Sequence, residues 1–166
     1  VGTLMSNLGM EVALRELGIP FARARVGDRY VLEMMEEKGW RLGGESSGHI
    51  ICRDVTTTGD GIVSALKVLA AISASGQGLR ALRSRVTKFP QTMINVRVAR
   101  RTDIGDNATI GDAVRAVERA LGDGGRVLLR PSGTEPVIRV MVEGDDAAQV
   151  EQHARELADV VRSAAA

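Results

Sequence analysis

RVLLRPSGTEPVIRVMV (residues 126–142) contains two apolar runs on either side of a polar loop that is flanked by proline. The runs at 126–130 and 137–142 are rich in Val, Leu and Ile, which favour β-strands. Pro131, Gly133 and Pro136 between them are typical of a tight turn. The stretch therefore predicts a β-hairpin whose loop presents Ser132 and Thr134.

Helical periodicity flanks this hairpin on both sides. One apolar stripe consists of Ile110, Val114, Val117 and Leu121, and a second one of Val150, Ala154, Leu157 and Val161. Thr109 and Asp112 resemble a capping box at the start of the first helix. With a further strand at 93–98, the order β-α-β-β-α predicts a small α+β domain over residues 87–166.

Residues 1–86 alternate between short strand-like and helical segments. Strands are expected at 1–5, 21–26, 40–42 and 50–52, and helices at 9–17 and 28–38, the second capped by Asp28 and ended by Gly39. A longer helix follows the run Thr56–Asp60, for which helix capping is the favoured reading. Its sequence is apolar on most faces, so we expect it to be buried. This alternation indicates an α/β layer.

Composition narrows the range of functions. The chain has 166 residues with 44% hydrophobic and 26% charged residues and a net charge of +1. This near-neutral balance excludes the basic surface that binds nucleic acid or an anionic membrane. Arg80, Arg83 and Arg85 are best explained as a solvated helix face. No apolar run approaches the ~20 residues of a membrane span, and the start lacks a signal-peptide pattern. Cys52 is the only cysteine, which fits a reducing compartment, so a cytoplasmic location is expected.

The loop at 130–136 combines the groups that an anion requires. Ser132 and Thr134 supply hydroxyls, and Gly133 allows consecutive N–H groups to converge. Arg130 and Arg139 supply guanidinium groups, which could reach one phosphate if the two strands pair. An ordinary hairpin turn explains the Ser, Gly and Thr about equally well.

A second loop, GGESSGH at 43–49, is also rich in glycine and polar groups. Glu45, Ser47 and His49 alternate, so an extended loop would point them in one direction. A carboxylate can accept hydrogen bonds from two neighbouring sugar hydroxyls. The residues by themselves nevertheless slightly favour a solvated glycine loop.

The two loops together resemble a known family. Gly-Gly-Glu-x-Ser-Gly-His is similar to the sugar-binding loop of the α-D-phosphohexomutases, and Arg-Pro-Ser-Gly-Thr-Glu-Pro-Val-Ile-Arg-Val to their C-terminal phosphate-binding loop. Three further stretches resemble the sequences of the branch that acts on glucosamine phosphates: VGTLMSNLG (1–9), VGDRYV (26–31) and TTTGDGIV (56–63). That branch also favours a small polar residue at the position of Ser46. The match runs nearly end to end, and a chain that opens inside a strand suggests a fragment of a longer protein.

The resemblance implies a fold and an activity. Residues 1–86 are similar to an incomplete three-layer α/β domain III, and residues 87–166 to the TATA-binding-protein-like domain IV. The implied reaction interconverts glucosamine 6-phosphate and glucosamine 1-phosphate through a phosphoserine, Mg²⁺ and glucosamine 1,6-bisphosphate as intermediate. The phosphorylated serine and the Asp-x-Asp-x-Asp metal loop of the family have no counterpart here. We therefore expect no catalytic residue and no metal ligand in this chain, and no activity from it alone.

The resemblance also assigns ligand roles residue by residue. Sugar-binding candidates are Glu45, Ser47, His49 and Arg25, the last standing where the family usually has Lys. Phosphate-binding candidates are Arg130, Ser132, Gly133, Thr134 and Arg139. The implied partner is a phosphohexosamine, without nucleic acid or membrane, and dimers are common in the family. The alternatives are a phosphomannomutase or phosphoglucomutase fragment, or a non-catalytic sugar-phosphate-binding module.

Overall fold

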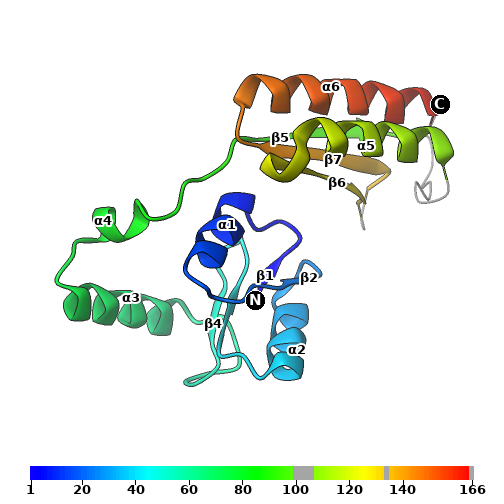
Figure 1. Ribbon diagram of the computed structural model, residues 1–166. Coiled ribbons are helices and arrows are strands. Elements are labelled where there is room, and N and C mark those ends of the chain that lie inside the picture. The colour runs from blue at the N-terminus through cyan, green and yellow to red at the C-terminus, as the bar shows by residue number, and fades with distance from the viewer. Residues whose placement is uncertain (99–106, 133–134, 165–166) are drawn as a thin grey trace. The chain divides into compact units, whose positions relative to one another are not determined.

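The computed structural model describes residues 1–98, 107–132 and 135–164, which form two compact units, Val1–Lys88 (unit 1) and Phe89–Ala166 (unit 2). Each unit combines helices with a small sheet, so the predicted mixed α/β class is confirmed (Figure 1). None of the helices in these described ranges is long and apolar enough to cross a bilayer.

Unit 2 is an antiparallel sheet with two helices on one face (Figure 1). The predicted hairpin consists of β6 and β7, and β5 pairs with the other edge of β7, giving the strand order β5-β7-β6. The elements are β5 (Gln91–Arg97), α5 (Ala108–Leu121), a 3-10 turn (Gly122–Gly124), β6 (Gly125–Pro131), β7 (Val137–Gly144) and α6 (Ala147–Ala164). The predicted order β-α-β-β-α is therefore present.

The core of unit 2 is aliphatic and lies between the sheet and the helices. Both predicted helical stripes are confirmed, because they pack against alternate residues of the central strand. The buried core residues are Val96, Val98, Ile110, Val117, Ile138, Val140, Val142, Val150, Ala154, Leu157, Ala158 and Val161. Since strand side chains alternate between faces, the residues between them on β7 point to the opposite, helix-free face of the sheet.

Unit 1 contains two short strand pairs that backbone hydrogen bonds join. The elements are β1 (Gly2–Thr3), α1 (Leu8–Glu16), β2 (Arg23–Ala24), α2 (Asp28–Lys38), β3 (Leu42–Gly44), β4 (Ile50–Cys52), α3 (Gly61–Ser75) and α4 (Leu79–Arg83). β1 runs parallel to β2, and β3 runs antiparallel to β4. The Val1 nitrogen donates to the Leu42 carbonyl at 2.9 Å, and the Gly44 N–H donates to the Val1 carbonyl at 3.0 Å. β1 thus lies between β2 and β3, over a small core of Ala24, Val31, Met35 and Ile51.

Two predicted N-cap residues, Asp28 and Thr109, are wrong. The α2 helix begins at Asp28 itself after Gly27, and the Asp28 carboxylate accepts only the N–H of Arg29, at 2.8 Å. The α5 helix is capped by Asn107, whose side chain accepts the Ile110 N–H at 3.2 Å, so Thr109 lies inside the first turn. Asparagine is among the strongest N-cap residues, which explains why the helix begins before Thr109. The predicted end of α2 at Gly39 is confirmed by its left-handed φ of 67°.

The α3 helix confirms one prediction and overturns another. Asp60 caps it by accepting the N–H groups of Ile62 and Val63 at 2.8 and 2.9 Å, as predicted. Its expected burial is wrong, because Ile62 and Leu66 are 76% and 60% exposed and no α3 residue is buried. The helix packs mainly against β4, and one strand covers only a narrow strip of an apolar helix.

Replacing Asp60 with Ala should lower the free energy of unfolding of unit 1 by about 1 kcal/mol, because two N–H groups at the start of α3 lose their acceptor. Thermal denaturation followed by far-ultraviolet circular dichroism measures this change. Asp28→Ala is the matched control, since Asp28 also lies in a first turn but is not the N-cap residue and accepts a single N–H group, that of its neighbour Arg29. Equal losses in both variants would contradict the capping role.

Candidate functional site

The two arginines of the predicted phosphate loop lie directly opposite each other across the hairpin. The register of β6 and β7 pairs Arg130 with Arg139, and the register of β5 and β7 pairs Asn95 with the same Arg139. Residues paired in this way point to the same face of a sheet. Arg130 and Arg139 therefore extend side by side from the helix-free face, as the sequence predicts for a paired hairpin.

The charges of this pair are not neutralised. Within the described ranges neither Arg130 nor Arg139 has an acidic partner, whereas Arg126 on the same strand pairs with Glu143 at 2.7 Å. Like charges directly opposite each other in a sheet destabilise it. A phosphate oxygen placed between two guanidinium groups would remove this repulsion and would accept charge-assisted hydrogen bonds. The arrangement thus has the charge and the donors that an anion requires.

Ser132 shapes the loop that follows Arg130. Its N–H donates to the Val137 carbonyl at 2.8 Å, and its Oγ accepts the N–H of Glu135 at 3.3 Å. Ser132 is buried, and these bonds show the turn chemistry that the sequence offered as an alternative. A hydroxyl that accepts a hydrogen bond can still donate one, so Ser132 keeps the chemistry of a ligand donor. The other two predicted phosphate ligands, Gly133 and Thr134, lie outside the described residues.

The predicted sugar-binding loop is a turn and not an extended segment. The Glu45 N–H donates to the His49 carbonyl at 3.0 Å, the Gly48 N–H donates to the Glu45 carbonyl at 3.1 Å, and Gly48 has a φ of 96°. The turn still brings the three predicted side chains together. Ser47 Oγ lies 2.8 Å from His49 Nδ1, which lies 3.6 Å from Glu45 Oε1. The residues therefore converge, although the alternation argument for their convergence does not apply.

Glu45 also contacts a residue that the sequence did not connect with it. Its Oε2 accepts the N–H of Gly27 at 3.2 Å, and its side chain is 11% exposed. No local signal could have indicated this contact, because Gly27 precedes α2 and Glu45 follows β3. Arg25 lies in the same segment as Gly27, but its guanidinium stacks on the Tyr30 ring at 4.3 Å from the centroid. The structure therefore links Arg25 to the loop only through the backbone of its segment.

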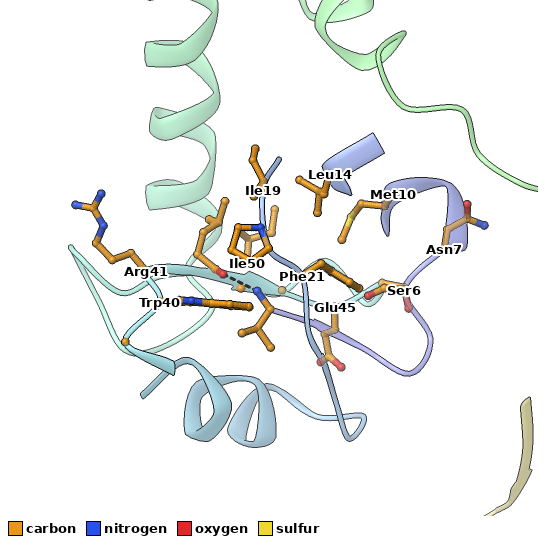
Figure 2. Close-up of a pocket in the computed structure, with 17 residues that line it drawn as sticks. Ser6, Asn7, Met10, Leu14, Ile19, Phe21, Trp40, Arg41, Glu45 and Ile50 are labelled. Atoms are coloured by element: carbon orange, nitrogen blue, oxygen red, sulfur yellow. Dashed lines mark hydrogen bonds between the residues drawn. The ribbon is translucent and has the colours of Figure 1, made fainter. Parts of the chain in front are cut away.

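A pocket of about 680 Å³ lies beside this loop (Figure 2). Its walls include Met10, Leu14, Ile19, Phe21, Trp40 and Ile50. In Figure 2 the Glu45 carboxylate points away from Met10, Leu14 and Ile19. An apolar wall offers no partners for a phosphate or for sugar hydroxyls. The polar groups beside this apolar wall include Glu45 and Ser46 of the turn, which also line the pocket.

The described residues do not fit a metal ion. Nowhere in ranges 1–98, 107–132 and 135–164 do three or more His, Cys, Asp or Glu side chains gather in a way that could hold one. Cys52 is a free, buried thiol. Any magnesium chemistry would therefore need ligands from outside the described residues.

Two family models match this chain in succession. "Phosphoglucomutase/phosphomannomutase, alpha/beta/alpha domain III" matches residues 1–89, and "Phosphoglucomutase/phosphomannomutase, C-terminal domain" matches residues 93–160. A solved structure of N-acetylphosphoglucosamine mutase from Aspergillus fumigatus, in complex with GlcNAc-6P and magnesium, superposes with a TM-score of 0.83. At 19% identity, over 99% of this chain and 39% of that one, this likeness shows the shared fold.

Sequence relatives are much closer. Phosphoglucosamine mutase from Cellvibrio japonicus is 65% identical over 99% of this chain and 37% of the relative, and the enzyme from Nitrosococcus oceani is 63% identical over 97% and 36%. The chain thus spans little more than a third of the length of these curated relatives. The two domain matches and the sequences of the two loops indicate the same family. The chain belongs to the phosphoglucomutase/phosphomannomutase family.

Proposed function

We propose that this chain is the part of a phosphoglucosamine mutase that holds the sugar and the phosphate that does not react. The observation that carries the proposal is the pair Arg130 and Arg139, two adjacent cations without an acidic partner in the described part of the chain. The relatives named phosphoglucosamine mutase support the choice of a glucosamine phosphate as substrate and, with it, a cytoplasmic metabolic role.

The two loops would divide the work of binding. The Arg130–Arg139 pair binds phosphate oxygens through planar N–H donors, with the Ser132 hydroxyl as a further donor. On the loop of unit 1, Glu45 accepts hydrogen bonds from sugar hydroxyls, because a carboxylate that already accepts the Gly27 N–H retains free lone pairs. Ser47 and His49 complete this polar edge. These contacts orient the substrate and raise its effective concentration, and they break no bond.

For the longer enzyme the same proposal includes a magnesium ion, a phosphoserine and glucosamine 1,6-bisphosphate as the intermediate. In the Aspergillus fumigatus structure, the protein binds GlcNAc-6P and magnesium. This chain offers no metal cluster among its described residues. We likewise propose that residues 1–86 form the sugar-binding domain and residues 87–166 the phosphate-binding domain. The proposed assembly is a homodimer.

A chimera tests the function directly. The matching segment of the Cellvibrio japonicus phosphoglucosamine mutase is replaced by these 166 residues, and turnover of glucosamine 6-phosphate is measured beside that of mannose and glucose phosphates. We expect the chimera to keep its preference for the glucosamine substrate. A chimera that prefers mannose or glucose phosphate would favour the alternative branch. A folded chimera that binds sugar phosphate without turnover would favour a non-catalytic module.

Glu45 provides a residue-level prediction for the same chimera. Glu45→Ala should lower kcat/KM by about 10- to 100-fold, because the sugar loses an ionised acceptor and the Gly27 N–H loses its partner. Glu45→Gln keeps one acceptor oxygen and should lose less. Steady-state kinetics measures both, with Glu37→Ala as the control, since Glu37 is exposed on α2. A Glu45→Ala chimera with unchanged kcat/KM would remove Glu45 from the site.

A further inference from the structure

We propose that Gly59 is a positioning residue, which holds His49 and through it the turn with Glu45 and Ser47. The inference rests on the function proposed above, and it adds a segment outside both ligand loops. Gly59 lies between β4 and α3, two residues before the helix begins at Gly61. It therefore belongs to the run of residues that caps α3.

The contact between Gly59 and His49 leaves no room for a side chain. A Cβ atom on Gly59 would lie 2.8 Å from His49 Cβ, 3.1 Å from His49 Cα and 3.2 Å from His49 Cδ2. His49 Cα and Cβ, the two nearest atoms, are fixed by the backbone and cannot rotate away, whereas Cδ2 belongs to the ring. The backbone conformation does not itself demand glycine, because Gly59 is not one of the positive-φ glycines. Close approach to His49 is thus the reason for glycine at this position.

A displacement of His49 would be passed on to the other two side chains of the loop. The His49 carbonyl accepts the N–H of Glu45 at 3.0 Å, so a shift of the His49 backbone also moves Glu45. The His49 ring contacts Ser47 Oγ at 2.8 Å. Gly59 therefore supports the whole polar edge of the turn through one packing contact.

The segment on the other side of the contact is held firmly. Asp60 caps α3, and Ser64 Oγ in the first helical turn donates to the Asp60 carbonyl at 2.7 Å and lies 3.4 Å from the Ile50 carbonyl, beside His49. Lys67 adds an exposed ion pair to Asp54 at 2.6 Å, and its hydrogen bond lowers the pKa of the Asp54 carboxyl. A methyl group at position 59 would therefore push His49 and its turn, because the helix start is fixed to β4.

Nuclear magnetic resonance of the 166-residue chain tests this contact. The chain has two histidines, so each imidazole gives separable signals. Gly59→Ala should shift the ring-proton and Nδ1 signals of His49. His153 is the internal reference, since it lies in unit 2 with its Nδ1 3.2 Å from Glu156 Oε2. Gly61→Ala is the matched control: a Cβ there meets nothing within 4 Å, and both histidine signals should remain in place.

Titration with glucosamine 6-phosphate gives the functional readout. The His49 signals of the unsubstituted chain should respond to the sugar phosphate and not to inorganic phosphate, and Gly59→Ala should weaken that response by about three- to tenfold, the loss of roughly one hydrogen bond. Unchanged His49 signals in Gly59→Ala, or equal changes in Gly61→Ala, would overturn the inference. A silent His49 in the unsubstituted chain would instead refute the proposed sugar site.

A second variant covers the case in which Gly59→Ala unfolds unit 1. The double variant Gly59→Ala with His49→Gly lacks the nearest atom of the contact, His49 Cβ. Its far-ultraviolet circular dichroism should return to that of the unsubstituted chain if the contact is the cause of unfolding. A double variant that remains unfolded would show that glycine at position 59 serves another purpose.

Discussion

Arg139→Gln should weaken the binding of inorganic phosphate by about 10- to 100-fold and leave unit 2 as stable as before, or slightly more stable. The two effects have opposite signs because Arg139 faces Arg130 across the hairpin without an acidic partner in the described residues. Removing one of two adjacent cations relieves repulsion in the free protein and removes attraction in the complex. A residue that serves the fold alone would not separate the two quantities in this way.

Isothermal titration calorimetry with inorganic phosphate and urea denaturation in phosphate-free buffer measure the two quantities. Arg126→Gln is the matched control, since Arg126 lies on the same strand but pairs with Glu143, which is 0% exposed. That variant should lose several kcal/mol of unfolding free energy, on the order of the 3–5 kcal/mol of a broken buried pair, and keep its phosphate affinity. Unchanged phosphate affinity in Arg139→Gln would remove Arg139 from the site.

Leu157→Ala should lower the free energy of unfolding of unit 2 by about 2–5 kcal/mol. Leu157 is 1% exposed on α6 and belongs to a cluster made of unit 2 residues alone. The loss combines the transfer free energy of the removed atoms with the cost of the cavity that remains. Leu157→Met, which nearly conserves the volume, should cost less than about 1.5 kcal/mol.

Two probes separate the units in this experiment. Trp40, the only tryptophan, lies in unit 1, so its fluorescence follows that unit, whereas far-ultraviolet circular dichroism follows both. We expect Leu157→Ala to move part of the dichroism transition to lower urea and to leave the Trp40 transition in place. A loss below about 1 kcal/mol would contradict the cavity argument. A parallel shift of Trp40 would contradict the separate cores.

The sequence by itself determined the elements whose signals are local. Apolar spacing in α5 and α6, and the run of Val, Leu and Ile around RPSGTEP, predicted the helices and the hairpin of unit 2 correctly. The hairpin predicted only that both arginines could reach one phosphate, and the register that pairs Arg130 with Arg139 came from the structure. Gly39 and Asp60 marked helix ends correctly because capping depends on neighbouring residues only. The ligand roles of the two loops stay a prediction, which came from the resemblance of their sequences to a known family and not from the residue types alone.

The tertiary structure alone decided what depends on residues distant in the sequence. The apolar pattern of α3 predicted burial, but burial requires an opposing surface, and β4 covers little of this helix. The contact of Glu45 with Gly27 and the approach of Gly59 to His49 join segments that no periodicity connects. A sequence pattern records what each residue prefers locally, whereas these contacts arise only when the strands and helices pack together in space.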